Sequence, residues 1–434
     1  MHQPNYQEPR TSRLAMPWVR LHATKDYLDM PLMAAAQPEV KVTFNLVPSL
    51  LDQIELYLHG GTDPHLELSR VNPSEASTET RLEIIDSFFL GNAATMIEPY
   101  PHFRALYRKA RANGNKGESL ARLFSSAELR DLQVWSNLVW ADPLFREEEP
   151  LRSLFAKGRY FTEEEKHALL DWQLQLMGRI VPTYRRLLED GHIDISFTPY
   201  YHPILPLLCD TNVALEALPS LSLPRRRFRH PEDARTQIEL AAEKYRELFG
   251  RELQGMWPSE GSVSEEVAEL AKDAGLKWIA TDEEILHHSL AKSRLSQHEN
   301  PIHAVYQVGD GLRILFRDHG LSDRIGFVYS TWPAQRAVED FLEHIKALRR
   351  RYREHLDSTV VPVILDGENA WEYFHDDGRE FLERLYARLA EDPEIETVTF
   401  SQAATEMTAH SLPRLFAGSW INHNFRIWIG HPED

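Results

Sequence analysis

The sequence has one cysteine, few positive charges for its acidity, and no long hydrophobic run. The single thiol, Cys209, excludes an intramolecular disulfide and is more typical of a small buried side chain than of a nucleophile. The 48 Lys and Arg residues against 66 Asp and Glu residues give a formal charge of -18 at pH 7. Such acidity argues against nucleic acid or an anionic membrane as the main partner. Because no stretch approaches roughly 18 consecutive apolar residues, we expect no membrane span.

The chain also lacks a recognisable signal peptide, so the expected location is cytoplasmic. It opens on a polar, loop-like run, residues 1–6, in which His-Gln-Pro at position 2 resembles the end of a strand. It ends as abruptly, on a run from 418 to 434 that is too rich in Trp, Asn and His to be a dispensable tail. We therefore expect a chain that is truncated at both ends, with its last segment folded back onto a site.

Length and hydrophobic content favour one large domain. With 434 residues, of which 42% are hydrophobic, the chain can bury a core of the size that a barrel with helical additions needs. Strands are expected at residues 40–47, 193–198, 253–257, 277–281, 360–365 and 397–400, and helices at 18–33, 231–249, 264–274, 333–355 and 378–390. Residues 304–308 and 312–316 flank Gly309-Asp310-Gly311, which predicts a hairpin.

The alternation of strands and helices implies a parallel sheet. Carboxylates that follow successive strands favour a barrel over an open sheet. Residues 74–190 have a long helical texture and are predicted to be an insertion between two strands of this barrel. The expected organisation is a barrel over residues 1–400 that carries the insertion, followed at 401–434 by the start of a helical C-terminal region.

Two carboxylates come directly after predicted strands. Glu260 follows a short apolar run, and Asp366 follows an aliphatic one. The loops at the C-terminal strand ends of a barrel converge on one rim, and glycoside hydrolysis needs a pair of carboxylates. Trp257 precedes Glu260 and Trp371 follows Asp366, and such aromatic faces suit the apolar faces of sugar rings. The alternative interpretation is that each carboxylate only caps the helix that follows it.

Other polar side chains also follow predicted strands. Three prolines stiffen the loop 199–206, which holds Tyr200, Tyr201 and His202. A lone histidine is usually structural, but a rigid loop at a strand end also suits a functional one. Asp282 follows the strand at 277–281 in the same way.

Arg317, Asp318 and His319 end the second arm of the predicted hairpin. Side chains of these types can orient a catalytic carboxylate, bind sugar hydroxyls or ligate a metal ion. The residues by themselves therefore predict a carbohydrate-active barrel with two candidate carboxylates.

Five segments resemble, in order, the motif regions of glycoside hydrolase family 57. They are His2-Gln3-Pro4, the run 199–208, Trp257-Pro258-Ser259-Glu260, Asp366-Gly367-Glu368-Asn369-Ala370-Trp371-Glu372 and Gly418-Ser419-Trp420-Ile421. The match spans nearly the whole chain, and five ordered motifs are far more specific than any one. The resemblance implies an incomplete (β/α)7 barrel with a helical region that acts on α-glucans by a retaining mechanism, without a metal ion or other cofactor.

The resemblance also implies roles for single residues. Glu260 matches the nucleophile and Asp366 the general acid/base, and His2, His202, Trp257, Asp282 and Trp420 match positions around the substrate. The full set of predicted substrate-binding residues is His2, Gln3, Tyr200, Tyr201, His202, Trp257, Asp282, Arg317, Asp318, His319, Glu368, Trp371, Trp420 and Asn422.

Several functions remain open at this stage. The wording of the motifs around Glu260 and Asp366 most resembles the α-amylase and amylopullulanase branch, while 4-α-glucanotransferase or branching activity is the alternative within the family. Two alternatives come from other classes. One is a metal-dependent carbohydrate deacetylase or mannosidase with His2, Asp318 and His319 as ligands, and the other is a catalytically silent carbohydrate-binding protein. The expected partner is an α-glucan or maltooligosaccharide, and the sequence leaves the oligomeric state open.

Overall fold

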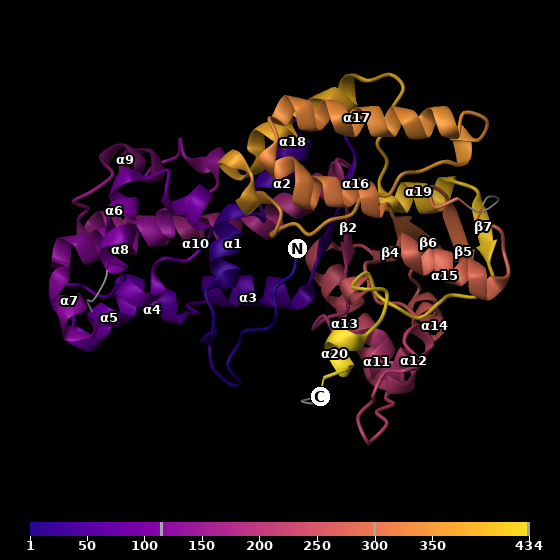
Figure 1. The fold of residues 1–434 in the computed structure, drawn as a ribbon, viewed down its shortest axis with the longest axis horizontal. Helices are drawn as coiled ribbons and strands as arrows, with labels where there is room; N and C mark the ends of the chain where they lie inside the picture. Colours follow the sequence, from indigo (N-terminus) through magenta and orange to yellow (C-terminus); the bar gives the residue numbers. More distant parts are fainter. Residues whose placement is uncertain (113–115, 298–300, 432–434) are drawn as a thin grey trace.

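The computed structural model describes residues 1–112, 116–297 and 301–431. Within these ranges, seven strands form one sheet in the order β1-β2-β3-β4-β6-β5-β7 (Figure 1). The strands are β1 (Val42–Leu46), β2 (Ile193–Phe197), β3 (Gly255–Met256), β4 (Trp278–Asp282), β5 (Val305–Val308), β6 (Leu312–Arg317) and β7 (Ala409–Leu412).

Most strand pairs are parallel, as the predicted alternation requires. β1 pairs with β2, β2 with β3, β3 with β4, and β4 with β6, all in parallel. β5 and β6 pair antiparallel through Val308 and Leu312, which confirms the predicted hairpin. β7 lies parallel to β5 at one end of the described sheet, and β1 lies at the other. The predicted parallel α/β sheet is therefore confirmed, while closure into the expected incomplete barrel is not seen among the described strands.

Helices extend to one side of the sheet across residues 48–189 (Figure 1). They are α3 (Pro48–Leu58), α4 (Pro64–Arg70), α5 (Thr78–Ser87), η1 (Ala93–Ile97), α6 (Pro101–Ala110), α7 (Glu118–Leu123), α8 (Ser126–Leu138), η2 (Pro143–Phe145), α9 (Leu151–Lys157) and α10 (Glu163–Glu189). The 27-residue α10 begins at a capping box formed by Thr162 and Glu165 and leads back to β2. The helical texture predicted for residues 74–190 is thus seen in the structure.

Arg20 joins this helical part to the first helix of the chain. Its guanidinium is fully buried and donates to Asp63 at 2.9 Å, to Asn137 at 2.9 Å and to Gln173 at 2.8 Å. The acceptors come from the start of α4, from α8 and from α10. A buried cation is tolerated only when it is paired in this way, so the network fixes the insertion against α1 (Trp18–Lys25).

The other helices lie around the sheet, with α16 to α19 on one side and α11 to α14 on the other (Figure 1). They are α2 (Asp29–Ala35), α11 (Leu205–Cys209), α12 (Ala214–Ala217), α13 (Pro231–Phe249), α14 (Glu265–Asp273), α15 (Glu283–Ser293), α16 (His319–Asp323), α17 (Ala334–Arg351), α18 (Arg379–Glu391), α19 (Phe400–Glu406) and α20 (Arg426–Ile429). Three of them agree closely with the prediction: α13, α14 and α18 begin and end within one residue of it. In the described part of the chain, no helix is long and apolar enough to cross a membrane.

Three local predictions were wrong. Residues 360–365 are extended but join no described strand: Pro362 has no N–H, and Val360 donates to the carbonyl of His303 at 3.1 Å. Residues 397–400 are not a strand, because Thr399 forms a capping box with Gln402 and starts α19. The helix expected at 18–33 is split into α1 and α2.

The C-terminal part also differs from the expected helical region. Residues 409–412 form β7, and only the short helices α19 and α20 lie in the described part of 400–431. The end of the region expected at 401–434 lies outside the described residues.

Candidate active site

Glu260 lies just beyond the end of β3, in the short turn η4 (Ser259–Gly261). Its backbone is left-handed, with φ 56° and ψ 29°, a conformation that non-glycine residues seldom adopt and that occurs at functional sites. Gly261 follows with φ +59°, and a Cβ there would lie 3.0 Å from the indole ring of Trp257. The turn therefore packs tightly against Trp257 and holds the Glu260 carboxylate in one place.

The tail of the chain supplies a hydrogen bond to this carboxylate. Trp420 Nε1 donates to Glu260 Oε2 at 2.9 Å, and the Trp420 backbone N–H donates to the Glu260 carbonyl at 3.1 Å. An isolated antiparallel bridge between Val263 and Gly418 sets this position. Because the indole N–H occupies Oε2, the second oxygen, Oε1, is left to face the other side of the site.

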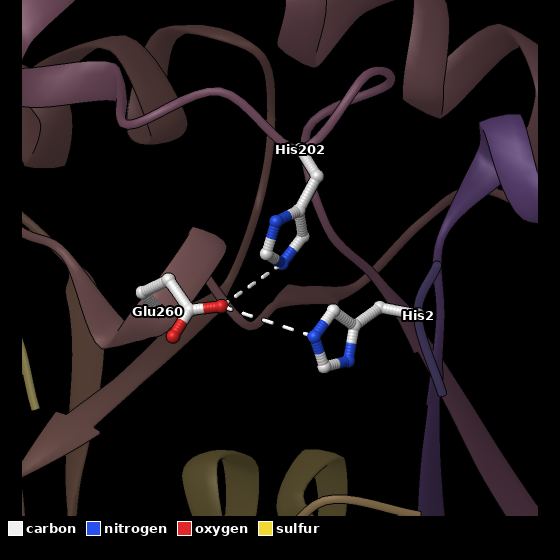
Figure 2. A group of neighbouring side chains, drawn as sticks. All are labelled: His2, His202 and Glu260. Carbon is white, nitrogen blue, oxygen red and sulfur yellow. Dashed lines mark ion pairs between the residues drawn. The ribbon is translucent and has the colours of Figure 1, made fainter. Parts of the chain in front are cut away.

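Two histidines lie on that side, at similar distances from Glu260 Oε1. The contact from His2 Nε2 is 3.9 Å and that from His202 Nε2 is 4.0 Å (Figure 2). The two imidazole rings stack with their centroids 4.9 Å apart. His202 also has a left-handed backbone, with φ 57°, so both it and Glu260 are held in strained conformations that face each other.

His202 is uncharged at neutral pH. Burial, together with the neighbouring His2, lowers the pKa of His202 to about 3. Its ring therefore offers one N–H and one lone pair to the site rather than a positive charge.

Asp366 also lies beside His2. His2 Nδ1 is 4.0 Å from Asp366 Oδ1, so the same imidazole ring is within 4.0 Å of both candidate carboxylates. The Asp366 side chain is 32% exposed and accepts a 3.3 Å hydrogen bond from Asn369. Nearby, the side chain of Glu368 is only 1% exposed, and its Oε1 accepts the His2 backbone N–H at 2.5 Å. Glu368 therefore fixes the backbone of His2 beside the two candidate carboxylates.

These residues line one cavity of about 880 Å³. His2, His202, Trp257, Glu260, Asp366, Trp371 and Trp420 all contribute to its wall. Trp257 and Trp420 meet edge to face with ring centroids 5.2 Å apart. The cavity continues inward between β1 and the extended residues 360–365, where its walls are mainly aliphatic. Carboxylates and indole rings thus share one concavity, the kind of site in which small ligands bind.

A second polar cluster surrounds the buried Asp282 at the end of β4. Arg317 Nη1 lies 3.3 Å and His319 Nδ1 3.4 Å from Asp282 Oδ2. The Arg317 guanidinium also lies 5.4 Å from the Trp420 ring centre. Asp282 thus holds Arg317 against Trp420, and Trp420 in turn donates to Glu260. Asp282 and Arg317 therefore lie where they can position the Glu260 carboxylate through Trp420. His423, which the sequence analysis did not single out, approaches Asp282 Oδ1 at 3.7 Å from the same tail.

Some predicted residues lie elsewhere. Tyr200 donates to Asp52 at 2.5 Å, and Tyr201 is 53% exposed beside α13, so neither lines the cavity of Glu260. Asp318 accepts from His303 Nε2 at 2.8 Å and caps α16. Burial acts to raise the pKa of Asp318, but the hydrogen bonds from His303 and the Leu321 N–H, with the nearby charge of Arg317, together lower it.

Three further predicted residues have structural contacts. Gln3 accepts a hydrogen bond from Tyr6 at 3.2 Å. Trp371 reaches the cavity wall, but it is 3% exposed and its indole donates to Met30 Sδ at 3.2 Å. Asn422 is exposed and has a left-handed backbone. These surroundings fit packing and turn formation as well as contact with a ligand.

The metal set considered from the sequence does not assemble. Among the described residues, His2 is not grouped with Asp318 and His319. Donor atoms of His2, His202 and Glu260 do lie within 4.8 Å of one another, as do those of Asp282, His319 and His423. An ion in the first group would occupy the free oxygen of Glu260, and one in the second would compete with Arg317 for Asp282.

The chain resembles known proteins along nearly its whole length. It is 24% identical over 273 residues to a protein of Methanocaldococcus jannaschii named "Putative alpha-amylase", and the alignment covers 59% of this chain and 50% of that protein. The chain thus spans about half the length of this curated relative. Its fold is similar to that of a family 57 branching enzyme from Pyrococcus horikoshii, with a TM-score of 0.58 and 14% identity over 100% of this chain and 74% of that one.

An α-amylase from Thermotoga maritima gives a TM-score of 0.57 with 13% identity over 98% of this chain and 77% of that one. At such identities these structures show a shared fold only. The family model described as Glycosyl hydrolase family 57 matches residues 1–415, so the chain belongs to this family.

Proposed function

We propose that this family 57 chain is a retaining, α-glucan-active glycosidase in which Glu260 is the nucleophile and Asp366 the general acid/base. The observation that carries the proposal is the position of His2. One imidazole nitrogen lies 3.9 Å from Glu260 and the other 4.0 Å from Asp366, so both carboxylates face the same space. A retaining mechanism needs two carboxyl groups about 5 to 5.5 Å apart on either side of the scissile bond.

The two carboxylates have surroundings that suit different roles. Glu260 accepts the indole N–H of Trp420 and is held by a strained backbone, as expected of an ionised nucleophile that must stay aimed at one carbon atom. Asp366 is more exposed and has only a long hydrogen bond to Asn369. An acid/base must exchange protons with the leaving group and with water, which this exposure allows.

Double displacement then follows from these positions. Glu260 attacks the anomeric carbon, while Asp366 gives its proton to the departing glycosidic oxygen. In the second step Asp366 takes a proton from the incoming water or sugar hydroxyl, which attacks the glycosyl-enzyme and frees Glu260. The neutral His202 and the ring of His2 are placed to hydrogen-bond sugar hydroxyls beside the nucleophile.

Hydrolysis and transfer differ only in what attacks the intermediate. We favour the α-amylase or amylopullulanase type, on the wording of the motifs around Glu260 and Asp366. A 4-α-glucanotransferase or branching enzyme would use the same residues.

Product analysis tests the proposal. The protein is incubated with maltoheptaose, amylose and pullulan beside Glu260→Gln and Asp366→Asn, and the anomer formed first is followed by proton NMR. We expect maltooligosaccharides with retained α configuration that disappear in Glu260→Gln, and longer products would indicate transfer. Inverted products would refute the mechanism. Glucan binding without turnover in the wild type would instead favour a silent carbohydrate-binding protein.

A further inference from the structure

Three buried aspartates from distant parts of the chain face one another outside the cavity lining. Asp29 is in the first turn of α2, Asp142 precedes η2, and Asp377 is in the turn η9 (His375–Gly378). Their exposed fractions are 0%, 2% and 9%. One carboxylate oxygen from each lies within 4.8 Å of those of the other two.

These carboxylates have too few partners for their burial. Within the described residues, neither oxygen of Asp29 has a hydrogen-bond donor, and Oδ2 of Asp142 has none either. The other Asp142 oxygen accepts from the Leu144 N–H at 2.6 Å. An ionised carboxylate that is buried without a donor or a cation is costly. Asp29 is therefore an unpartnered, fully buried acid that points into the group.

The charges around the group do not balance. Lys25 is the lysine in contact, and its ammonium lies 2.5 Å from Asp377 and 2.7 Å from Asp26. It is thus shared between two carboxylates and leaves Asp29 and Asp142 uncompensated. The site therefore needs additional positive charge, which either protons or a metal ion can supply.

We propose that Asp29, Asp142 and Asp377 bind one hard divalent cation, and that Ca²⁺ fits better than Mg²⁺. Carboxylate oxygens are the ligands that both ions prefer. With bonds of about 2.3–2.6 Å, two ligands of one Ca²⁺ can lie up to roughly 5 Å apart, whereas the bonds of about 2.0–2.1 Å in Mg²⁺ sites limit this separation to roughly 4 Å. The oxygens of the three aspartates lie within 4.8 Å of one another, which one Ca²⁺ can bridge. Mg²⁺ usually keeps several of its waters and is seldom held by protein ligands alone, so three buried carboxylates suit Ca²⁺ better.

The backbone around Asp377 is also shaped for such a site. Asp376, Asp377 and Gly378 have successive left-handed φ values of 44°, 56° and 74°. Left-handed backbone is unfavourable for aspartate and persists where the surroundings fix it. This turn points the Asp377 carboxylate inward to Asp29 and Asp142, which lie on other segments.

The cation would hold Asp29 and Asp142 against Asp377, which lies on the segment that follows Asp366. A Cβ on Gly378 would lie 2.7 Å from the Trp371 ring, and the Trp371 indole donates to Met30, the neighbour of Asp29. A Cβ on Gly367 would in turn lie 3.4 Å from Met30 Cε. Asp29, Asp142 and Asp377 are thus positioning residues that would fix the segment from Gly367 to Gly378 against α2 and the insertion.

Calcium binding to the full chain tests this inference without any glucan. The protein is stripped with EGTA and titrated with CaCl₂ by calorimetry, and thermal unfolding is followed in Ca²⁺ and in EGTA. We expect one Ca²⁺ per chain and an unfolding midpoint that rises with Ca²⁺ concentration. Asp29→Asn should weaken binding at least tenfold, by analogy with the loss of supporting residues at metal sites. Glu147→Gln, which removes an exposed acid near Asp142, should leave binding unchanged.

A second measurement needs no variant. Tb³⁺ resembles Ca²⁺ in its preference for oxygen ligands, so its emission, excited through nearby tryptophans, should appear in the wild type and disappear as Ca²⁺ is added. Absence of calorimetric heat, of Tb³⁺ emission and of any midpoint change in EGTA would overturn the site and leave protons as the missing charge. In that case Asp29→Asn would stabilise the fold. Tighter binding of Mg²⁺ than of Ca²⁺ would overturn the choice of ion.

Discussion

Replacing Trp420 by Phe isolates the hydrogen bond on the proposed nucleophile. The variant keeps an aromatic ring against Trp257 and Arg317 but removes the N–H that reaches Glu260 Oε2 at 2.9 Å. Glu260 then lacks a donor that fixes its orientation, while its strained backbone stays the same. The main effect should therefore be on the chemical step and not on the fold.

The magnitude follows from the kind of bond that is lost. A hydrogen bond to a charged group contributes about 1.5–3 kcal/mol, and each 1.36 kcal/mol corresponds to a tenfold change in rate. If the bond acts in the transition state, kcat/KM should fall by roughly ten- to a hundredfold, and kcat should carry most of the fall.

The assay is steady-state cleavage of maltoheptaose, with thermal unfolding as a check on the fold. Trp332→Phe is the matched control, because this partly exposed indole packs against Arg336 and is not among the residues that line the cavity. It should retain wild-type rates. Should Trp420→Phe keep kcat/KM within about twofold of the wild type while Glu260→Gln is inactive, the indole bond does not position the nucleophile.

Three further predictions concern stability. Arg20→Met leaves Asp63 buried without its cation and should lower the free energy of unfolding in urea by about 3–5 kcal/mol. A loss below about 1 kcal/mol would show that the Tyr57 hydroxyl and the Leu66 N–H, both at 2.8 Å, are enough for Asp63. Gly255→Ala would put a Cβ 1.8 Å from the Trp278 ring and should lower the free energy of unfolding by about 1–3 kcal/mol or more. The control Gly326→Ala, which has no atom within 4 Å of the new Cβ, should leave it nearly unchanged in the same urea titration. The pKa of His202 is lowered from 6.5 to about 3 in the folded state, so below pH 6.5 the unfolded chain binds a proton that the folded chain does not. Stability should therefore fall as the pH drops from 6.5 towards 3, by at most about 5 kcal/mol from this group. His202→Gln should make the unfolding midpoint fall less steeply with pH, and an unchanged slope would contradict this assignment.

The sequence predicted the local elements where one strong signal decides them. The hairpin at Gly309-Asp310-Gly311 and the helix α13 form as expected, because turn glycines and a proline with acids at a helix start act within a few residues. It failed where a longer-range partner decides. Residues 360–365 look like a strand by composition, yet Pro362 has no donor, and the hydrogen bonds of this run go to His303 and Asp318 and form no ladder.

The proposed site shows the same division. The sequence places Glu260 and Asp366 directly after apolar runs. It could not show that the Tyr200 side chain points away from the cavity, where its hydroxyl donates to Asp52. The buried acids Asp29, Asp142 and Asp377 had no sequence signal, because each is a common helix-start or turn residue and they meet only through the packing of the insertion on α2.

The contact between Trp420 and Glu260 shows why such a site cannot be read from local pattern. The two residues are 160 positions apart, and they meet beside the bridge between Val263 and Gly418. A Cβ on Gly418 would lie 2.6 Å from Ile285 Cδ1 and 2.7 Å from the His423 carbonyl, so only glycine lets the tail approach this closely. The Glu260 turn is strained on one side and held by this tail on the other. Contacts within the chain thus fix the carboxylate on both sides, which is the orientation that the proposed nucleophile would require.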